Sequence, residues 1–151
     1  MKISIIRTFQ ALLFTLAFGA VPAIAAEPLQ TQFGINGEIE VDLIKIGVDD
    51  GVLTAVFAYR NTVSKKSEIR SSVSEVFYLD KSEGKKYHVL TDTNGKWIAA
   101  PIDKYATINI NIPTEGKKLV WFKFPAPAQG CDEIDIVLPD ALPFENIALN
   151  Q

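Results

Sequence analysis

The sequence contains one cysteine and one histidine, the side chains that most often serve as nucleophile and base. A nucleophilic thiol needs a nearby base and a lowered pKa, so Cys131 and His88 would have to meet in the fold. His88 lies in the segment KKYHVL, whose alternation places it opposite Tyr87 and Val89 and toward solvent. We therefore expect Cys131 to be an inert structural thiol, with an intermolecular disulfide as the alternative, and we expect no catalytic residues.

The carboxylates could serve metal binding or acid-base chemistry. Residues 92–96, DTNGK, resemble a fragment of a calcium loop, but the further oxygen ligands and the distal glutamate are missing. Asn94 and Gly95 within it are typical of a type I′ hairpin turn. Asp132 and Asp135 could pair as acid and base, yet the sequence shows no burial that would separate their pKa values. We expect no metal and no cofactor.

The strongest surface candidate is the segment KKLVWFKF. Strand alternation turns one set of its side chains to the core and the other set outward. The outward set combines apolar and basic side chains: Lys117, Leu119, Trp121 and Lys123. A tryptophan flanked by lysines can anchor a protein or carbohydrate contact, unless a loop or the chain terminus covers this face. Trp97, after the Asn-Gly turn, either stacks on a sugar at a sheet rim or packs on its own hairpin.

The first residues predict export. Lys2 and Arg7 form a short basic region, the apolar run ALLFTLAFGAVPAIA follows, and AIA at residues 23–25 offers the small residues that a signal peptidase requires. The apolar run is too short for a comfortable membrane span. We expect residues 1–26 to be a cleaved signal peptide, the protein to be periplasmic or secreted, and the mature chain to have no membrane span.

The remaining residues, 27–151, are enough for one domain with one core. Without Lys2 and Arg7, 13 basic residues face 18 acidic ones, and the net charge falls from −3 to −5. This balance argues against nucleic acid as a partner.

Most segments between the turn residues alternate with period two, which predicts an all-β domain. EIEVDLIKIGV changes phase near residue 43, as a strand with a β-bulge does, and the following DDG predicts a hairpin turn with a positive φ at Gly51. VLTAVFAYRN is apolar on both faces, which requires cover on both sides or a partner on one. Residues 62–74 have no apolar period and predict the longest loop.

The later segments EVFYLD, KKYHVL, KWIA, ATININ, KKLVWFKF, EIDIVL and FENIAL predict further strands. Prolines stand before and after EIDIVL and never within it, so they end strands and do not form a proline-rich ligand. We expect the last segment to close an immunoglobulin-like antiparallel β-sandwich of about eight or nine short strands, with a small β-barrel as the alternative.

The motifs LTAVFAYRN, VFYLD followed by GKKYHVL, NGKW and VWFKFPAP followed by IDIVLP and PFENI resemble a group of uncharacterised exported bacterial immunoglobulin-like β-sandwich proteins. Related segments are sometimes carried beside an OmpA-like peptidoglycan-binding domain. Because the chain ends soon after PFENIAL, we expect no such domain here. The resemblance implies a Gram-negative envelope setting and a non-catalytic role.

Together these features predict an exported module that binds another cell-envelope protein through the face near Trp121 or through residues 62–74. A small glycan- or peptidoglycan-binding module, with Trp97 and Trp121 as stacking platforms, is the alternative. An enzyme would require Cys131, His88 or an aspartate to converge with other catalytic groups.

Overall fold

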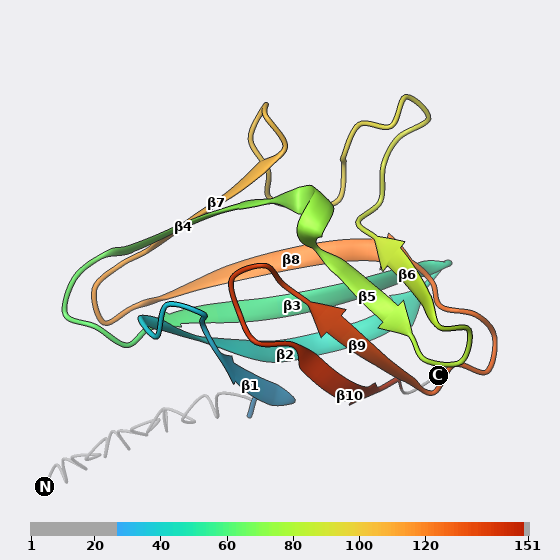
Figure 1. Cartoon of the computed structure of the whole chain (residues 1–151), viewed down its shortest axis with the longest axis horizontal. Helices are drawn as coiled ribbons and strands as arrows, with labels where there is room; N and C mark the ends of the chain where they lie inside the picture. Colours follow the sequence, from blue (N-terminus) through green and yellow to red (C-terminus); the bar gives the residue numbers. More distant parts are fainter. Residues whose placement is uncertain (1–26, 150–151) are drawn as a thin grey trace, which may run out of the picture.

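The computed structural model describes residues 27–149 and shows two antiparallel layers that are not closed into a barrel (Figure 1). The predicted β-sandwich is confirmed. The predicted signal peptide, residues 1–26, lies outside the described residues. Within the described part of the chain, no helix is long and apolar enough to cross a membrane.

One layer is a four-stranded sheet in the order β1-β2-β3-β8, and the other contains a second four-stranded sheet in the order β10-β9-β5-β6. The first sheet comprises β1 (Gln30–Phe33), β2 (Ile39–Asp49), β3 (Val52–Asn61) and β8 (Lys117–Pro125). The second comprises β5 (Phe77–Asp80), β6 (Lys85–His88), β9 (Glu133–Val137) and β10 (Phe144–Ala148). Immunoglobulin domains place their third strand in the opposite sheet. This chain is also a β-sandwich, but its first three strands, β1, β2 and β3, lie in the same sheet.

The long β2–β3 hairpin has both local features that its sequence predicts. The register shifts between Leu43 and Lys45, which leaves Ile44 as the extra residue of a bulge. At the turn, Asp50 and Gly51 have φ values of 47° and 76°, the left-handed pair of a type I′ connection. The bulge reverses the alternation of β2, so that Ile46 faces the core side again, as Leu43 does.

Residues 62–74 do not form the predicted long loop. They contain β4 (Ser67–Ser72), which pairs with β7 (Thr107–Ile112), and the start of a short 3-10 turn, η1 (Val73–Glu75). Alternation in β4 is carried by serines: Ser67 and Ile69 are buried and Glu68 is exposed. Because some of the inward positions of β4 are serines, the sequence shows no alternation of apolar and polar residues there. The strand is therefore not predicted from hydrophobicity.

The segment KWIA is not a strand. Trp97 makes one isolated bridge with Thr91, and the intervening turn has a positive φ at Gly95 but not at Asn94, so it is not type I′. The carboxylate of Asp92 closes this turn by accepting hydrogen bonds from the backbone N–H groups of Asn94 and Lys96 at 2.9 Å. When an aspartate precedes an Asn-Gly pair, its side chain can therefore close the turn by hydrogen bonds to the backbone, and a type I′ hairpin need not form.

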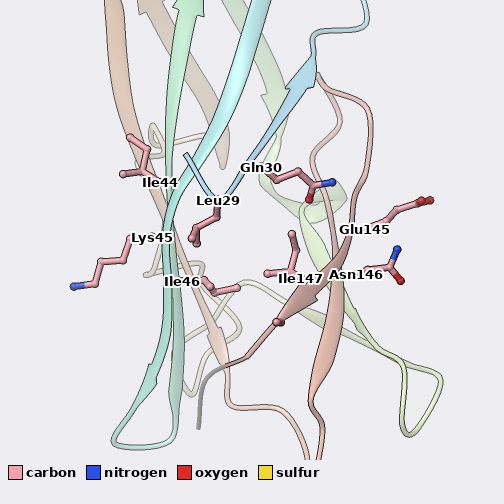
Figure 2. Close-up of a pocket in the computed structure, with 9 residues that line it drawn as sticks. Leu29, Gln30, Ile44, Lys45, Ile46, Glu145, Asn146 and Ile147 are labelled. Carbon is pink, nitrogen blue, oxygen red and sulfur yellow. The ribbon is translucent and has the colours of Figure 1, made fainter. Parts of the chain in front are cut away.

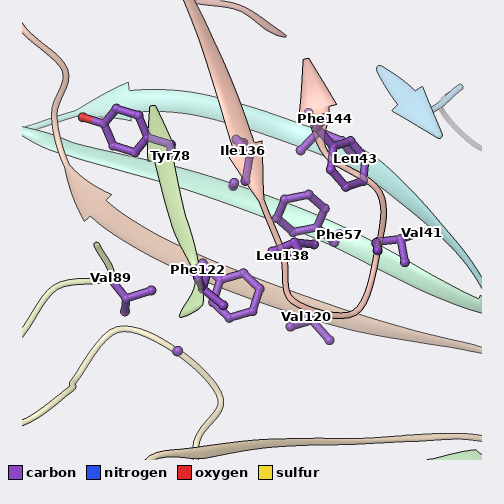
Figure 3. Close-up of a cluster of buried hydrophobic side chains, with 14 of the residues drawn as sticks. Val41, Leu43, Phe57, Tyr78, Val89, Val120, Phe122, Ile136, Leu138 and Phe144 are labelled. Atoms are coloured by element: carbon purple, nitrogen blue, oxygen red, sulfur yellow. The ribbon is translucent and has the colours of Figure 1, made fainter. Parts of the chain in front are cut away.

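The core lies between the layers and is rich in aromatic rings (Figure 3). Phe57 on β3 meets Phe144 on β10 at 5.2 Å between ring centroids and Phe122 on β8 at 6.1 Å. Tyr78 on β5 stacks on Tyr87 at 5.0 Å. The Phe57–Phe144 contact joins the two sheets, as does the edge contact between Tyr78 and Phe124 on β8 at 5.5 Å. Such contacts hold the layers together in a chain that has one cysteine and therefore no internal disulfide.

The C-terminal segment closes the sandwich as predicted. β10 pairs with β9, and the loop before β10 joins the edge of the first sheet. Ile35 donates a backbone hydrogen bond to Asp140 at 3.0 Å, and Leu142 donates one to Phe33 at 3.0 Å. The two sheets are thereby joined by backbone hydrogen bonds at this end of β1.

Candidate interaction surface

The first sheet carries an apolar patch on the face that turns away from the core. Its members come from β3 and β8, where Val56 pairs with Trp121 and Ala58 pairs with Leu119. We call these four residues the outer patch, in which Val56 is partly buried and Ala58 is buried. Leu119 is 58% exposed and Trp121 is 41% exposed, so neither a loop nor the described termini cover them. The outward orientation predicted for both is confirmed.

Three lysines border the outer patch. Lys117 and Lys123 lie two positions from Leu119 and Trp121 along β8, and Lys45 pairs with Val56 from the β2 side. All three side chains are exposed, and none forms a salt bridge with another residue of the described range. The border is therefore locally basic although the whole chain is acidic.

A polar network occupies the neighbouring part of the same face. Arg60 forms ion pairs with Asp42 and with Glu40, the latter at 2.7 Å, and the hydroxyl of Thr31 donates to Asp42 at 2.7 Å. The hydrogen bond from Arg60 lowers the pKa of Asp42, although burial opposes this shift. One guanidinium meets two carboxylates here, so the network has a net charge of −1, and the three lysines make the face positive on balance.

Trp97 does not belong to this surface. It is partly buried and packs against the core from the segment before β7. Of the two tryptophans singled out in the sequence, Trp121 is the exposed one, and the structure does not bring them together as one surface.

Cys131 is buried and lies two residues before β9. Its thiol donates to the backbone oxygen of Glu133 at 3.3 Å. Burial raises the pKa of this thiol, and the carboxylate of Asp80 raises it further. A nucleophilic cysteine requires the opposite shift, so this geometry is that of a structural thiol.

Two other chemical candidates have local structural roles. His88 is exposed on β6, where its ring packs 5.7 Å from that of Phe77. Asp92 directs its carboxylate to the backbone of its own turn. Within residues 27–149, no three His, Cys, Asp or Glu side chains form a group that could hold a metal ion.

A buried pair that sequence reasoning missed joins β3 to the loop before β10. The hydroxyl of Tyr59 donates to Asp140 Oδ1 at 3.4 Å, and the buried Oδ2 has no hydrogen-bond partner. Burial raises the pKa of Asp140, and the hydrogen bonds to its carboxylate offset this only in part. The two residues are 81 positions apart, so no local pattern could have indicated the pair.

No protein-family model matches the chain, and no curated protein or solved structure matches it. The resemblance to exported bacterial sandwich proteins therefore stays a prediction.

Proposed function

We propose that this protein is a non-catalytic module of the bacterial cell envelope that binds another envelope protein through the outer patch. The observation that carries the proposal is the exposure of Trp121 and Leu119, side by side with Val56 and Ala58 across two paired strands. Large aromatic side chains that combine with aliphatic neighbours in one patch are typical energetic centres of protein interfaces.

The charge around the patch favours a particular partner surface. Lys45, Lys117 and Lys123 surround the apolar centre and are not neutralised by salt bridges within residues 27–149. A partner with an apolar centre and an acidic rim would bury Trp121 and pair with these lysines at the edge. Rim charges of this kind mainly set the association rate and exclude partners of like charge.

The glycan alternative has less structural support. Trp97 packs against the core, so a stacking platform would depend on Trp121. The polar groups nearest Trp121 are exposed lysines, and the carboxylates of Asp42 and Glu40 on this face already pair with Arg60. A sugar site needs hydrogen-bonding groups placed to fix hydroxyl orientation. The protein partner is therefore the function that the geometry supports best.

The experiment is photocrosslinking in intact cells with a photoreactive residue in place of Leu119. The matched control carries the same residue in place of Tyr105, which is 74% exposed outside the patch. We expect one dominant envelope protein from position 119 and not from position 105. In the 119 background, Lys117→Glu with Lys123→Glu should reduce this adduct. Equal adduct patterns from both positions would refute the proposal.

A further inference from the structure

Beside the outer patch, the first sheet has an incompletely paired strand. β2 has 11 residues and β1 has 4, and their pairing ends at Gln30 with Leu43. Beyond the bulge, the backbone of Lys45–Asp49 pairs with β3 alone among the residues that the structure describes. One edge of β2 thus offers unpaired N–H and C=O groups.

A groove lies along this open edge. It has a volume of about 620 Å³ and runs between β2 and β10, which itself pairs with β9 alone. Ile46 from β2 and Ile147 from β10 point toward one another across the groove, and Leu29 lies above them (Figure 2). The two sheets are joined near Phe33. At the groove they are separated, and a longer β1 would occupy the space between them.

We infer that this groove binds an extended peptide segment of a partner protein, which pairs with β2 as an added strand. Only a polypeptide backbone supplies alternating donors and acceptors that match a strand edge. Five residues, Lys45–Asp49, extend about 17 Å at about 3.4 Å per residue, so the segment is short. The Oε1 atom of Gln30, a residue that lines the groove, is buried without a hydrogen-bond partner.

The lining of the groove defines the chemistry of the segment. Alternate side chains would point inward onto Ile46, Ile147 and Leu29, so they must be apolar. The residue opposite Lys45 would share the outer face with it, where an acidic side chain gives a favourable cross-strand pair. Lys45 forms no salt bridge within the described range and is separated from Trp121 by Val56 in one cross-strand row.

This inference rests on the proposed protein-binding role and adds the form of the segment that is bound. Apart from Lys45, which borders both sites, it uses different residues from the outer patch, so the two can fail separately. A partner could engage both sites, because the row from Trp121 through Val56 to Lys45 connects them.

The test is selection of random short peptides displayed on phage against the whole protein, followed by synthesis of the enriched sequences. We expect apolar residues at alternate positions and an Asp or Glu between them. N-methylation of alternate backbone nitrogens should weaken binding about tenfold or more, since it removes donors of the added strand. Lys45→Glu should weaken binding about tenfold.

Two variants serve as controls. Lys118→Glu changes an exposed lysine outside the groove and should leave the peptide affinity unchanged. Trp121→Ala should also leave it unchanged while it abolishes the crosslink at position 119, so failure of the groove is distinguished from failure of the outer patch. No enrichment, enrichment without alternation, or affinity insensitive to N-methylation would overturn the inference. Self-association of the protein that Lys45→Glu abolishes would also overturn it, because the occupant would then be a second copy.

Discussion

Replacing Asp80 with asparagine tests whether one buried carboxylate ties the end of β5 to the loop before β9. Asp80 is 0% exposed. Its Oδ1 accepts hydrogen bonds from the backbone N–H and hydroxyl of Ser82, at 2.8 Å and 2.6 Å, and from the N–H of Glu83 at 3.2 Å. Its Oδ2 accepts from the N–H of Ala128 at 3.1 Å, 48 positions away. An asparagine side chain has one neutral acceptor oxygen, so it can replace only one of the two carboxylate oxygens of Asp80. The amide nitrogen at the other position is a donor and cannot accept a hydrogen bond.

The size of the stability contribution from the Asp80 carboxylate follows from its pKa. Burial alone would raise the pKa of Asp80, but the hydrogen bonds from Ser82 and from the backbone N–H groups of Ala128 and Glu83, together with the nearby Cys131 thiol, outweigh it and lower the pKa from 3.8 to about 2. Because the folded pKa is depressed, the ionised carboxylate stabilises the fold above pH about 4, and this contribution is lost as the pH falls toward about 2. The pH-dependent part is about 2 kcal/mol of unfolding free energy.

The assay is urea unfolding followed by tryptophan fluorescence, for the unmodified protein and for Asp80→Asn, at several pH values from 7 to 2. At pH 7 we expect the variant to lose about 4 kcal/mol, because it also weakens buried hydrogen bonds. The difference between the two proteins should shrink by about 2 kcal/mol between pH about 4 and 2. Asp132→Asn, an exposed carboxylate in the same loop region, is the matched control and should change stability little. A difference that stays constant across this pH range would refute the reasoning.

Two further predictions concern buried charge and turn geometry. Asp140→Asn should raise the free energy of unfolding by about 1 kcal/mol at pH 7, because it removes a buried charge whose raised pKa makes ionisation costly. The gain should disappear at pH about 3, where the carboxyl is protonated in both states; urea titrations at the two pH values would show this, and a loss at pH 7 would contradict it. Gly51→Ala should cost about 1–2 kcal/mol, because Gly51 has a φ of 76°. Gly47→Ala, at a glycine of the same hairpin with open space at its Cβ and no positive φ, should cost far less, and equal losses in thermal unfolding would contradict the turn assignment.

Much of the fold follows from local patterns. The phase change near residue 43 and the DDG turn specify the bulge and the type I′ connection of the β2–β3 hairpin, because each depends on a few adjacent residues. The same alternation placed Leu119 and Trp121 outward. The errors also have local causes: β4 alternates through serines, and Asp92 closes the turn in which Asn94 and Gly95 predicted a hairpin.

The residue types of the candidate site could be predicted from the sequence, but the accessibility of these residues is set by the tertiary structure. Alternation assigns Trp121 to the outer face, but only the packed chain shows that this face stays uncovered while Trp97 packs against the core.

The sequence alone determined the all-β class, the phase of each long strand and the outward set of β8, because side-chain direction in a strand is a local property of the backbone. Only the tertiary structure decided which strands are neighbours and where pairing stops. The open edge of β2 arises because β1 is too short to cover it. The Tyr59–Asp140 and Asp80–Ala128 contacts join segments far apart in the chain, and such contacts are set by the packing of the whole sandwich.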